Sequence, residues 1–506
     1  MKMKKFVAML AILAVLAPTA ATAQNEVTKD TLLRANTDTL MKHIRVLSSS
    51  EYEGRMAGSQ AYLNAADYCA DVLASYGVKP LPALGEWGQY FQVEYNEIEN
   101  CNFYTYVNDN DTRTRYVLGR DYVCGSMTGR GYTNAPVVFC GWGIDNRAFD
   151  EYAKVDVQGK IVLCISGVPD FLPSKVTDHY ATLRDKAAVA KKHGAVGLVC
   201  VNMSEDCRFF EVQHRAYSGE GEYMPTFPVV QPTREMGMRL LENETMTFDS
   251  AVNALQNTMT PQSFHLRKNF EININAKYHP AATTANVIGY LPGYDEKLKR
   301  EIIVVGAHLD HVGMQGSTCV FPGADDNASG VAAVLETARL LTSCAPAAIE
   351  YNKRSIVFVL FSGGELEELG SSIFVSNFPQ LKYVECFINA ESIGSGDSIN
   401  VLGNKRFPLL WEIANRNDSI STKSLLHGYK TMPTGDAVPF SMVGIPSLVF
   451  TNYMGSNYVH VPSDISENIN RDILTKNASL MAEVIYELSL GDYQGRSFKS
   501  RHYKFE

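Results

Sequence analysis

Three runs in the second half of the chain decide its fold: EIIVVGAHLDH at residues 301–311, PGADDNASGVAAVLETARLL at residues 322–341 and SIVFVLFSGGELEELGS at residues 355–371. The first and third contain apolar stretches that suit strands buried on both faces, and the second reads as a turn followed by a helix. Alternating strands and helices predict an α/β fold with a doubly wound, mostly parallel sheet covered by helices on both faces. In such sheets, ligands bind beyond the carboxyl ends of the strands.

Side chains of the metal-binding kind follow these strands and the neighbouring elements. A histidine or a carboxylate comes after each of five segments: His308, Asp326, Glu365, Glu391 and His460. The carboxylate of Asp326 lies in a tight Gly/Asn turn before the helix, where it is placed to bridge two ions ~3.5 to 4 Å apart. Each residue alone is more typical of a helix cap or a hydrogen-bonded loop, but the joint pattern favours metal binding. Two histidines and three carboxylates suit paired zinc ions.

Two neighbours of His308 are less clearly defined. Asp310 lies two residues later, and we predict that its carboxylate hydrogen-bonds the outer imidazole nitrogen of His308 and fixes the tautomer. His311 follows directly, and the sequence leaves open whether it is a ligand or a structural residue. Histidines without such a context, for example His43 and His279, are interpreted as surface or structural residues.

The composition places the chain among globular proteins. Its 506 residues are 45% hydrophobic and 20% charged, which predicts a large core and two domains. The 46 basic and 55 acidic residues give a net charge of −9 without a long basic block, so nucleic-acid binding has little support. Of the ten cysteines, Cys140, Cys164 and Cys200 end apolar runs and resemble buried strand thiols, and the spacing assigns no disulfide.

The first 23 residues have the features of a secretory signal peptide. Lysines precede an apolar stretch at residues 6–17, and the small residues Ala21-Thr22-Ala23 predict cleavage before Gln24. The apolar stretch is shorter than the ~20 residues that a membrane-spanning helix needs, and no later segment reaches that length without charge. We therefore expect an exported protein, periplasmic or extracellular, with no membrane span.

The pattern of strands, helices and turns divides the chain into parts. Helical periodicity over residues 28–75 predicts two amphipathic helices that flank the loop EGRMAGS at residues 53–59. A separate alternation of strands and turns then predicts an inserted β-rich domain before the main sheet begins. The expected boundaries are a signal peptide at 1–23, an N-terminal part of the main domain at 24–110, the insert at 111–271 and the rest of the main domain at 272–506.

Several segments resemble the motifs of a known enzyme family. HLDH, GADDNASG, FSGGELEELGS, INAESIG and YVHVPSDISENI are similar, in order and spacing, to those of the secreted zinc aminopeptidases related to aminopeptidase Y, the transferrin receptor and glutaminyl cyclase. EGRMAGSQAYLNAADYCADVL resembles the N-terminal helix of that family. CGWGIDNRAFDEYAKVDVQGKIVLCISGVP and KKHGAVGLVCVN resemble the protease-associated domain that many members carry.

The resemblance implies roles for single residues. It implies that His308, Asp326 and Glu391 hold one zinc ion, that Asp326, Glu365 and His460 hold a second, and that Asp326 bridges the two. The implied chemistry is peptide hydrolysis by a metal-activated water, with a carboxylate beside a ligand as general base.

The chain departs from the family pattern at the expected base. The family usually has two consecutive glutamates, base then ligand, and the spacing places the ligand at Glu365 and the base at Gly364. Glu367 and Glu368 could supply the base from the next turn, or mark a shifted alignment. The family's aspartate is replaced by Glu391, and a common histidine is replaced by Ala437. The candidate catalytic residues are therefore Asp310, Glu367 and Glu368.

Three hypotheses remain open. The first is a secreted zinc exopeptidase, an aminopeptidase in particular, that acts on peptide substrates. The second is a metal- or peptide-binding homologue with impaired catalysis, motivated by Gly364. The third is an enzyme similar to glutaminyl cyclase that holds a single zinc ion, so the number of bound ions separates it from the first. Oligomeric state and side-chain specificity are not decided by the sequence.

Overall fold

The strand β12 (Ile302–His308) is packed between two separate cores and is buried along its whole length. Ile303 and Val305 belong to the apolar core on one face of the sheet, and Ile302 and Val304 belong to the core on the other. Successive side chains of a strand point to opposite faces, so this division shows a strand that is covered on both sides. The sequence predicted such a strand from this apolar run.

The computed structural model describes residues 33–107, 112–203, 223–343, 352–428, 430–455 and 459–493. The predicted signal peptide lies outside these ranges. Among the described residues, no helix combines the length and apolar character needed to cross a membrane.

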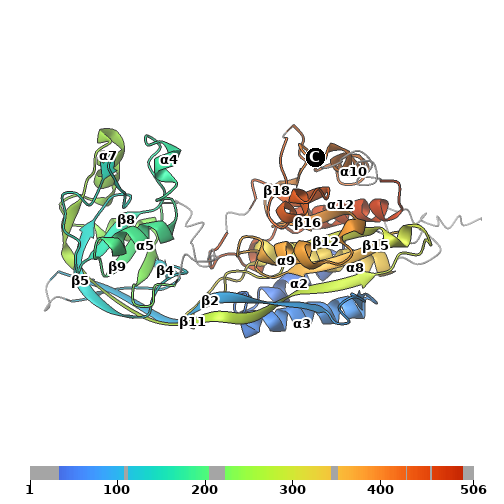
Figure 1. Ribbon diagram of the computed structural model, residues 1–506, viewed down its shortest axis with the longest axis horizontal. Helices are drawn as coiled ribbons and strands as arrows, with labels where there is room; N and C mark the ends of the chain where they lie inside the picture. Colours follow the sequence, from blue (N-terminus) through green and yellow to red (C-terminus); the bar gives the residue numbers. More distant parts are fainter. Residues whose placement is uncertain are drawn as a thin grey trace, which may run out of the picture.

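Two lobes are joined by a long two-stranded ribbon (Figure 1). The strands of the main lobe are β1 (Lys79–Pro80), β12, β13 (Met314–Gln315), β14 (Cys319–Val320), β15 (Ser355–Phe361), β16 (Val384–Ala390), β17 (Ser398–Leu402) and β18 (Ser447–Tyr453). Its helices are α2 (Thr37–Leu47), α3 (Gln60–Ser75), α8 (Gly330–Ser343), α9 (Leu369–Asn377), α10 (Pro408–Ile420), α11 (Ala437–Met442) and α12 (Arg471–Ser489). Its short helical turns are η1 (Ser50–Tyr52), η2 (Leu298–Arg300), η3 (Ala324–Ser329), η4 (Leu381–Tyr383) and η5 (Ser466–Asn468).

The main sheet has the predicted doubly wound arrangement. Its strand order is β17-β18-β16-β12-β15, and the next strand is β11 (Phe264–Leu291) of the ribbon. β12 runs parallel to β15 and β16, and β16 runs parallel to β18, whereas β17 and β11 are antiparallel to their neighbours. Residues of α2, α3, α8, α10 and α12 pack in the core on one face, and residues of α9 and α11 pack on the other. Parallel strands bring their carboxyl ends to one edge of the sheet, so the segments after β12, β15, β16 and β18 meet there.

The ribbon consists of β2 (Gly88–Tyr106) and β11, which pair antiparallel over almost their whole length. One part of β11 pairs with β15 of the main lobe, and another part pairs with β5 of the second lobe. A single strand therefore belongs to both lobes.

The second lobe, named the insert lobe below, continues the same sheet beyond β11 and has its own cores on the two faces. Its strands are β3 (Thr114–Tyr116), β4 (Tyr122–Cys124), β5 (Gly131–Phe139), β6 (Asp145–Asn146), β7 (Phe149–Asp150), β8 (Ile161–Ile165), β9 (Gly197–Val201) and β10 (Val229–Pro232). Its helices are α4 (Ser174–Thr177), α5 (Leu183–Lys192), α6 (Arg234–Leu240) and α7 (Phe248–Thr258). β5, β8, β9 and β10 are parallel neighbours, and β4 closes the edge antiparallel to β10. Helices α6 and α7 cover one face and α5 covers the other.

Candidate metal centre

All five predicted ligands meet at the carboxyl edge of the main sheet. His308 is the last residue of β12, Glu391 directly follows β16, and Glu365 lies in the loop after β15. Asp326 lies in η3, in front of α8, and His460 lies in the segment after β18. Five segments that are far apart in the sequence thus supply one cluster.

The first group of possible ligands is formed by His308, Asp326 and Glu391, whose ligand atoms all lie within 4.8 Å of one another. The His308 Nε2 atom lies 2.9 Å from Glu391 Oε1 and 3.4 Å from Asp326 Oδ1. The side chains of His308 and Asp326 are 7% and 8% exposed, whereas that of Glu391 is 26% exposed, so the group is buried on one side and accessible to water through Glu391.

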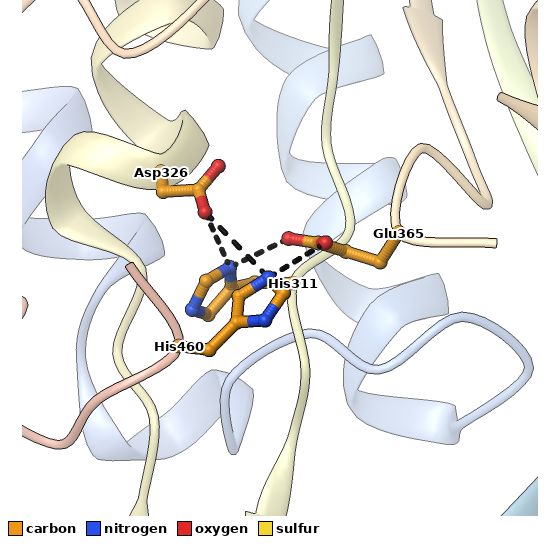
Figure 2. A group of neighbouring side chains, drawn as sticks. All are labelled: His311, Asp326, Glu365 and His460. Carbon is orange, nitrogen blue, oxygen red and sulfur yellow. Dashed lines mark hydrogen bonds and ion pairs between the residues drawn. The ribbon is translucent and has the colours of Figure 1, made fainter. Parts of the chain in front are cut away.

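The second group contains four residues, His311, Asp326, Glu365 and His460 (Figure 2). His460 Nε2 lies 2.8 Å from Glu365 Oε2 and 3.9 Å from Asp326 Oδ2. His311 Nδ1 lies 3.0 Å from Glu365 Oε1 and 3.7 Å from Asp326 Oδ2. The sequence left the role of His311 open, and the structure brings its imidazole, fully buried, into this group.

Asp326 is shared by the two groups, with one carboxylate oxygen directed to each. Its Oδ1 atom faces His308, and its Oδ2 atom faces His311 and His460. A carboxylate placed in this way can bridge two cations. The donors are imidazole nitrogens and carboxylate oxygens, which is the chemistry that zinc prefers, and they converge on two neighbouring points. The residues present therefore fit a pair of zinc ions.

Asp310 has a different partner from the predicted one. Its main-chain carbonyl lies 3.0 Å from His308 Nδ1, whereas its carboxylate is 3.9 Å from that nitrogen. The tautomer of His308 is therefore set by the carbonyl, because its geometry suits a hydrogen bond and that of the carboxylate does not. The carboxylate of Asp310 instead accepts hydrogen bonds from the main-chain N–H groups of Gly364 and Glu365, at 2.9 and 3.3 Å. It holds the loop that carries Glu365.

Gly364 occupies the position where the family pattern places a glutamate. A Cβ atom there would lie 2.4 Å from His308 Cβ and 2.5 Å from His308 Cγ. Such distances are much shorter than van der Waals contact, so His308 leaves no space for any side chain at residue 364. With Glu365 inside the second group, the geometry agrees with the alignment that makes Glu365 the ligand and Gly364 the residue in place of the base.

Asp464 fixes the turn that carries Asp326. Its two carboxylate oxygens accept hydrogen bonds from the main-chain N–H groups of Asp325 and Asp326, at 2.8 and 3.0 Å. Asn327 completes the turn, because its side-chain oxygen accepts a hydrogen bond from Gly330 N at the start of α8. The helix-capping role considered for this acidic turn thus belongs to Asn327, which leaves the Asp326 carboxylate directed at the two groups.

Arg55, in the EGRMAGS loop between α2 and α3, joins this loop to two ligand-bearing segments. Its buried guanidinium donates hydrogen bonds to the carbonyls of Leu309, Pro322 and Gly323, at 2.8, 2.8 and 2.9 Å, and to that of Leu47. Leu309 follows His308, and the other two acceptors precede η3. A buried cation at this position also offsets part of the negative charge of the surrounding carboxylates.

Two further acids, Glu368 and Asp436, lie beside the two groups. Glu368 is half-buried at the start of α9; burial raises the pKa of its carboxyl group, and the charges of Glu391 and Glu367 raise it further. Asp436 is fully buried, which raises its pKa to about 7, with an added contribution from the charge of Glu391. Its neighbour Gly435 lies against Glu391, because a Cβ at Gly435 would be 3.6 Å from Glu391 Oε2.

The sequence-based reasoning left the role of His311 open and missed two other residues that shape the site, Asp464 and Arg55. His311 was the histidine next to the HLD triplet, and its proximity to two ligand types was the available signal. Asp464 lies four residues after His460 in the same VHVPSD run, and Arg55 is a basic residue inside a glycine loop that is flanked by apolar helices. The sequence spacing of Asp464 and Arg55 does not indicate their hydrogen-bond partners, because those partners are main-chain groups of distant segments.

Two family models match the chain. Residues 286–485 match the model of peptidase family M28, and residues 133–240 match the PA domain. These ranges correspond to the main lobe after the ribbon and to most of the insert lobe, as the sequence resemblance implied.

Relatives and solved structures agree with these matches. The chain is 27% identical over 215 residues to a probable leucine aminopeptidase of Arthroderma otae, covering 40% of this chain and 57% of that protein. It is 28% identical over 249 residues to aminopeptidase YwaD of Bacillus subtilis, covering 46% of this chain and 50% of that protein. The chain thus spans about half the length of these relatives. The structure of BSAP, a zinc aminopeptidase from Bacillus subtilis, has the same fold, with a TM-score of 0.61, 22% identity and coverage of 90% of this chain and 96% of that one.

Proposed function

We propose that this chain is a zinc-dependent aminopeptidase that removes residues from the amino end of peptides. Its residues 286–485 match the model of peptidase family M28, and its residues 133–240 match the PA domain. The observation that carries this proposal is the placement of Asp326, whose two oxygens face two separate groups of histidine and carboxylate ligands. A pair of sites with a shared carboxylate is the arrangement of two-metal hydrolases.

We infer that two zinc ions bind the two groups. His308 and Glu391 would hold the first, His460 and Glu365 the second, with Asp326 between them and His311 as an additional donor of the second group. When bound, the ions supply the electrophilic character that activates water and polarises the scissile carbonyl.

Glu368 is the residue of this chain best suited to act as general base. It is half-buried, its raised pKa brings the carboxylate closer to the neutral range that favours proton transfer, and the charge of Glu391 acts on it. In this proposal Glu368 accepts a proton from the attacking water and returns it to the leaving amine. Gly364 supplies no base, and its lack of a side chain keeps the imidazole of His308 in place.

Charge favours the amino end of a peptide over the carboxyl end. Glu368 and the buried Asp436 add two acidic groups beside the first group, close enough for the charge of Glu391 to act on both. An ammonium group is attracted to such a site and a carboxylate is repelled. This charge distribution supports an aminopeptidase rather than a carboxypeptidase.

The test combines metal analysis with turnover. We expect the full chain from Gln24 to bind two zinc ions and to hydrolyse aminoacyl p-nitroanilides, with loss of activity on chelation. Glu368→Gln should lower kcat by about 10²- to 10⁴-fold while both ions stay bound, the range typical of a lost general base. Glu367→Gln is the matched control, one residue earlier in the same turn. If Glu367→Gln abolishes turnover instead, the base is Glu367.

The same experiment separates the remaining hypotheses. A chain that binds two ions but hydrolyses no substrate in a broad panel of aminoacyl substrates would be a metal- or peptide-binding homologue, the candidate that Gly364 favours. A chain that holds one tightly bound ion would point to chemistry similar to that of glutaminyl cyclase.

We also propose that the protein is exported, from the secretory features of residues 1–23. Mass spectrometry of the protein from the periplasm or the medium should find a chain that begins at Gln24. An intact amino terminus starting at Met1 in the cytoplasm would contradict export.

A further inference from the structure

The edge strand of the insert lobe, β4, lies against the segments that carry two ligands of the second group. Figure 1 shows β4 on the side of the insert lobe that faces the main lobe. Its central residue, Val123, forms one buried apolar cluster with Val312, Phe321 and Val461 of the main lobe. All four residues are at most 5% exposed, so this is a buried apolar contact between the lobes.

Two main-lobe members of this cluster directly follow residues of the second group in the sequence. Val312 directly follows His311, and Val461 directly follows His460. Phe321 precedes the segment that leads into η3. A shift of β4 would therefore move the segments on which the imidazoles of the second group are mounted, because close-packed side chains transmit displacement.

A buried glutamine fastens the same contact through hydrogen bonds. The side-chain amide of Gln315, 3% exposed, accepts a hydrogen bond from Cys124 N at 2.7 Å and donates one to Cys124 O at 2.9 Å. This two-point bond resembles the pairing of neighbouring strands and fixes the position of β4 against the loop. Gln315 lies four residues after His311 in that loop, and the adjacent Gly316 N donates to Ile98 O of the ribbon at 2.7 Å.

We propose that Gln315 and Val123 are positioning residues through which the insert lobe holds the segments of His311 and His460 in the geometry that binds metal. The inference rests on the proposed function only in using zinc as the ligand. It assigns the insert lobe a defined task, which is to complete the second group of ligands through contacts that touch no ligand atom.

The test measures zinc affinity and not activity. Zinc-free full chain is titrated with zinc in competition with a chromogenic chelator, and the visible spectrum of the Co²⁺-substituted protein reports the coordination of each site. We expect Gln315→Ala and Val123→Ala to bind one of the two ions 10- to 100-fold more weakly than the wild type, the usual effect of removing groups that orient ligands. The spectrum of that ion alone should change.

The matched control is Val138→Ala. Val138 lies in β5 and is fully buried in a core of the insert lobe that contains no main-lobe residue. Val138→Ala therefore removes the same methyl groups as Val123→Ala, but at a position that does not contact the segments carrying His311 and His460. It should bind both ions with wild-type affinity even though it lowers the melting temperature by a similar amount.

Two outcomes would overturn the proposal: wild-type affinity for both ions in Gln315→Ala and Val123→Ala, or an equal loss of affinity in Val138→Ala. If Gln315→Ala does not fold, Val123→Ala and its control decide alone. A wild type that binds two ions and hydrolyses nothing contradicts the proposed function but leaves this inference standing. A wild type that binds no zinc overturns both.

Discussion

At the scale of single residues, the centre depends on the missing side chain of Gly364 and on the guanidinium group of Arg55. The glycine gives His308 the space it occupies, and the arginine ties His308's segment to the turn of Asp326 through main-chain carbonyls. Neither residue is a predicted ligand. Both decide where ligands lie, and each leads to a prediction.

Gly364→Ala should weaken zinc binding at the first group by about 10-fold or more, because the added Cβ collides with the imidazole of His308. Gly455→Ala is the control, since a Cβ there makes a tight contact with Asn452 O at 3.3 Å but not the overlap found at Gly364. Isothermal titration with zinc measures both. Gly364→Glu, although it restores the glutamate of the family pattern, should also bind zinc poorly and fail to gain activity. Tight zinc binding by Gly364→Ala would show that His308 can move aside.

Arg55→Met should lower the free energy of unfolding by at least about 3 kcal/mol, because it leaves several buried carbonyls without donors at ~1 to 3 kcal/mol each. Arg55→Lys keeps the charge but lacks the planar fork, so it should recover only part of this loss. Arg45→Met, at an exposed position in α2, should change stability by less than about 0.5 kcal/mol. Urea unfolding of all three variants provides the comparison, and equal stability of Arg55→Met and the wild type would refute the role.

At the scale of elements, the loop before β6 in the insert lobe encloses an acid. Glu151 is 1% exposed and accepts hydrogen bonds from Trp142 N and Ile144 N, at 3.1 and 3.0 Å. Burial raises the pKa of its carboxyl group to about 8, although these hydrogen bonds and the charge of Lys186 act in the opposite direction. The folded lobe therefore binds a proton that the unfolded chain, with an ordinary glutamate pKa, has already lost at neutral pH.

The sign of the resulting pH dependence follows from proton linkage. Between the unfolded pKa of about 4.5 and the folded pKa of about 8, the folded state holds more protons than the unfolded state, so stability falls as pH rises through this window. Below pH 4.5 this contribution is fully present. Glu151→Gln should flatten the decline of the insert lobe's melting temperature between pH 5 and pH 8, measured with chelator present. An unchanged slope in Glu151→Gln would show that Glu151 is ionised in the folded lobe.

The elements were the most predictable part of the molecule. The helices that flank the EGRMAGS loop follow from their periodicity, because each buries one face. The strands before His308 and Glu365 follow from continuous apolar runs, and the turn before α8 follows from its Gly and Asn residues. The candidate ligands lie at the ends of these elements, so their meeting at one edge of the sheet follows from the same sequence patterns. The roles of Arg55, Gln315 and Asp464 could not, since each binds main-chain groups of segments that only the tertiary fold brings near, and such contacts leave no periodic trace in the sequence.

At the scale of the whole molecule, metal binding and folding of the main lobe should be linked. The centre joins segments from residue 308 to residue 460, and these segments separate when the lobe unfolds. Zinc at 100 times its Kd should stabilise the lobe by ~2.7 kcal/mol per ion, so chelation should lower its melting temperature. Asp326→Asn should remove most of this zinc-dependent shift, and the exposed Asp249→Asn in the insert lobe should retain it. A shift that persists in Asp326→Asn would place the metal elsewhere.

The ribbon strand β11 also has a consequence for how the protein is made. Helices α2 and α3 leave the ribosome first, yet the core they complete requires α8 and β15, which are synthesised more than 200 residues later. Every strand that the insert lobe needs has emerged once β11 is complete. Because domains tend to fold as they emerge, the insert lobe should form first and present the free half of β11 as a template. The early helices must keep their apolar faces from aggregating until β15 pairs with that template, which makes the nascent chain, rather than the finished protein, the state most in need of a chaperone.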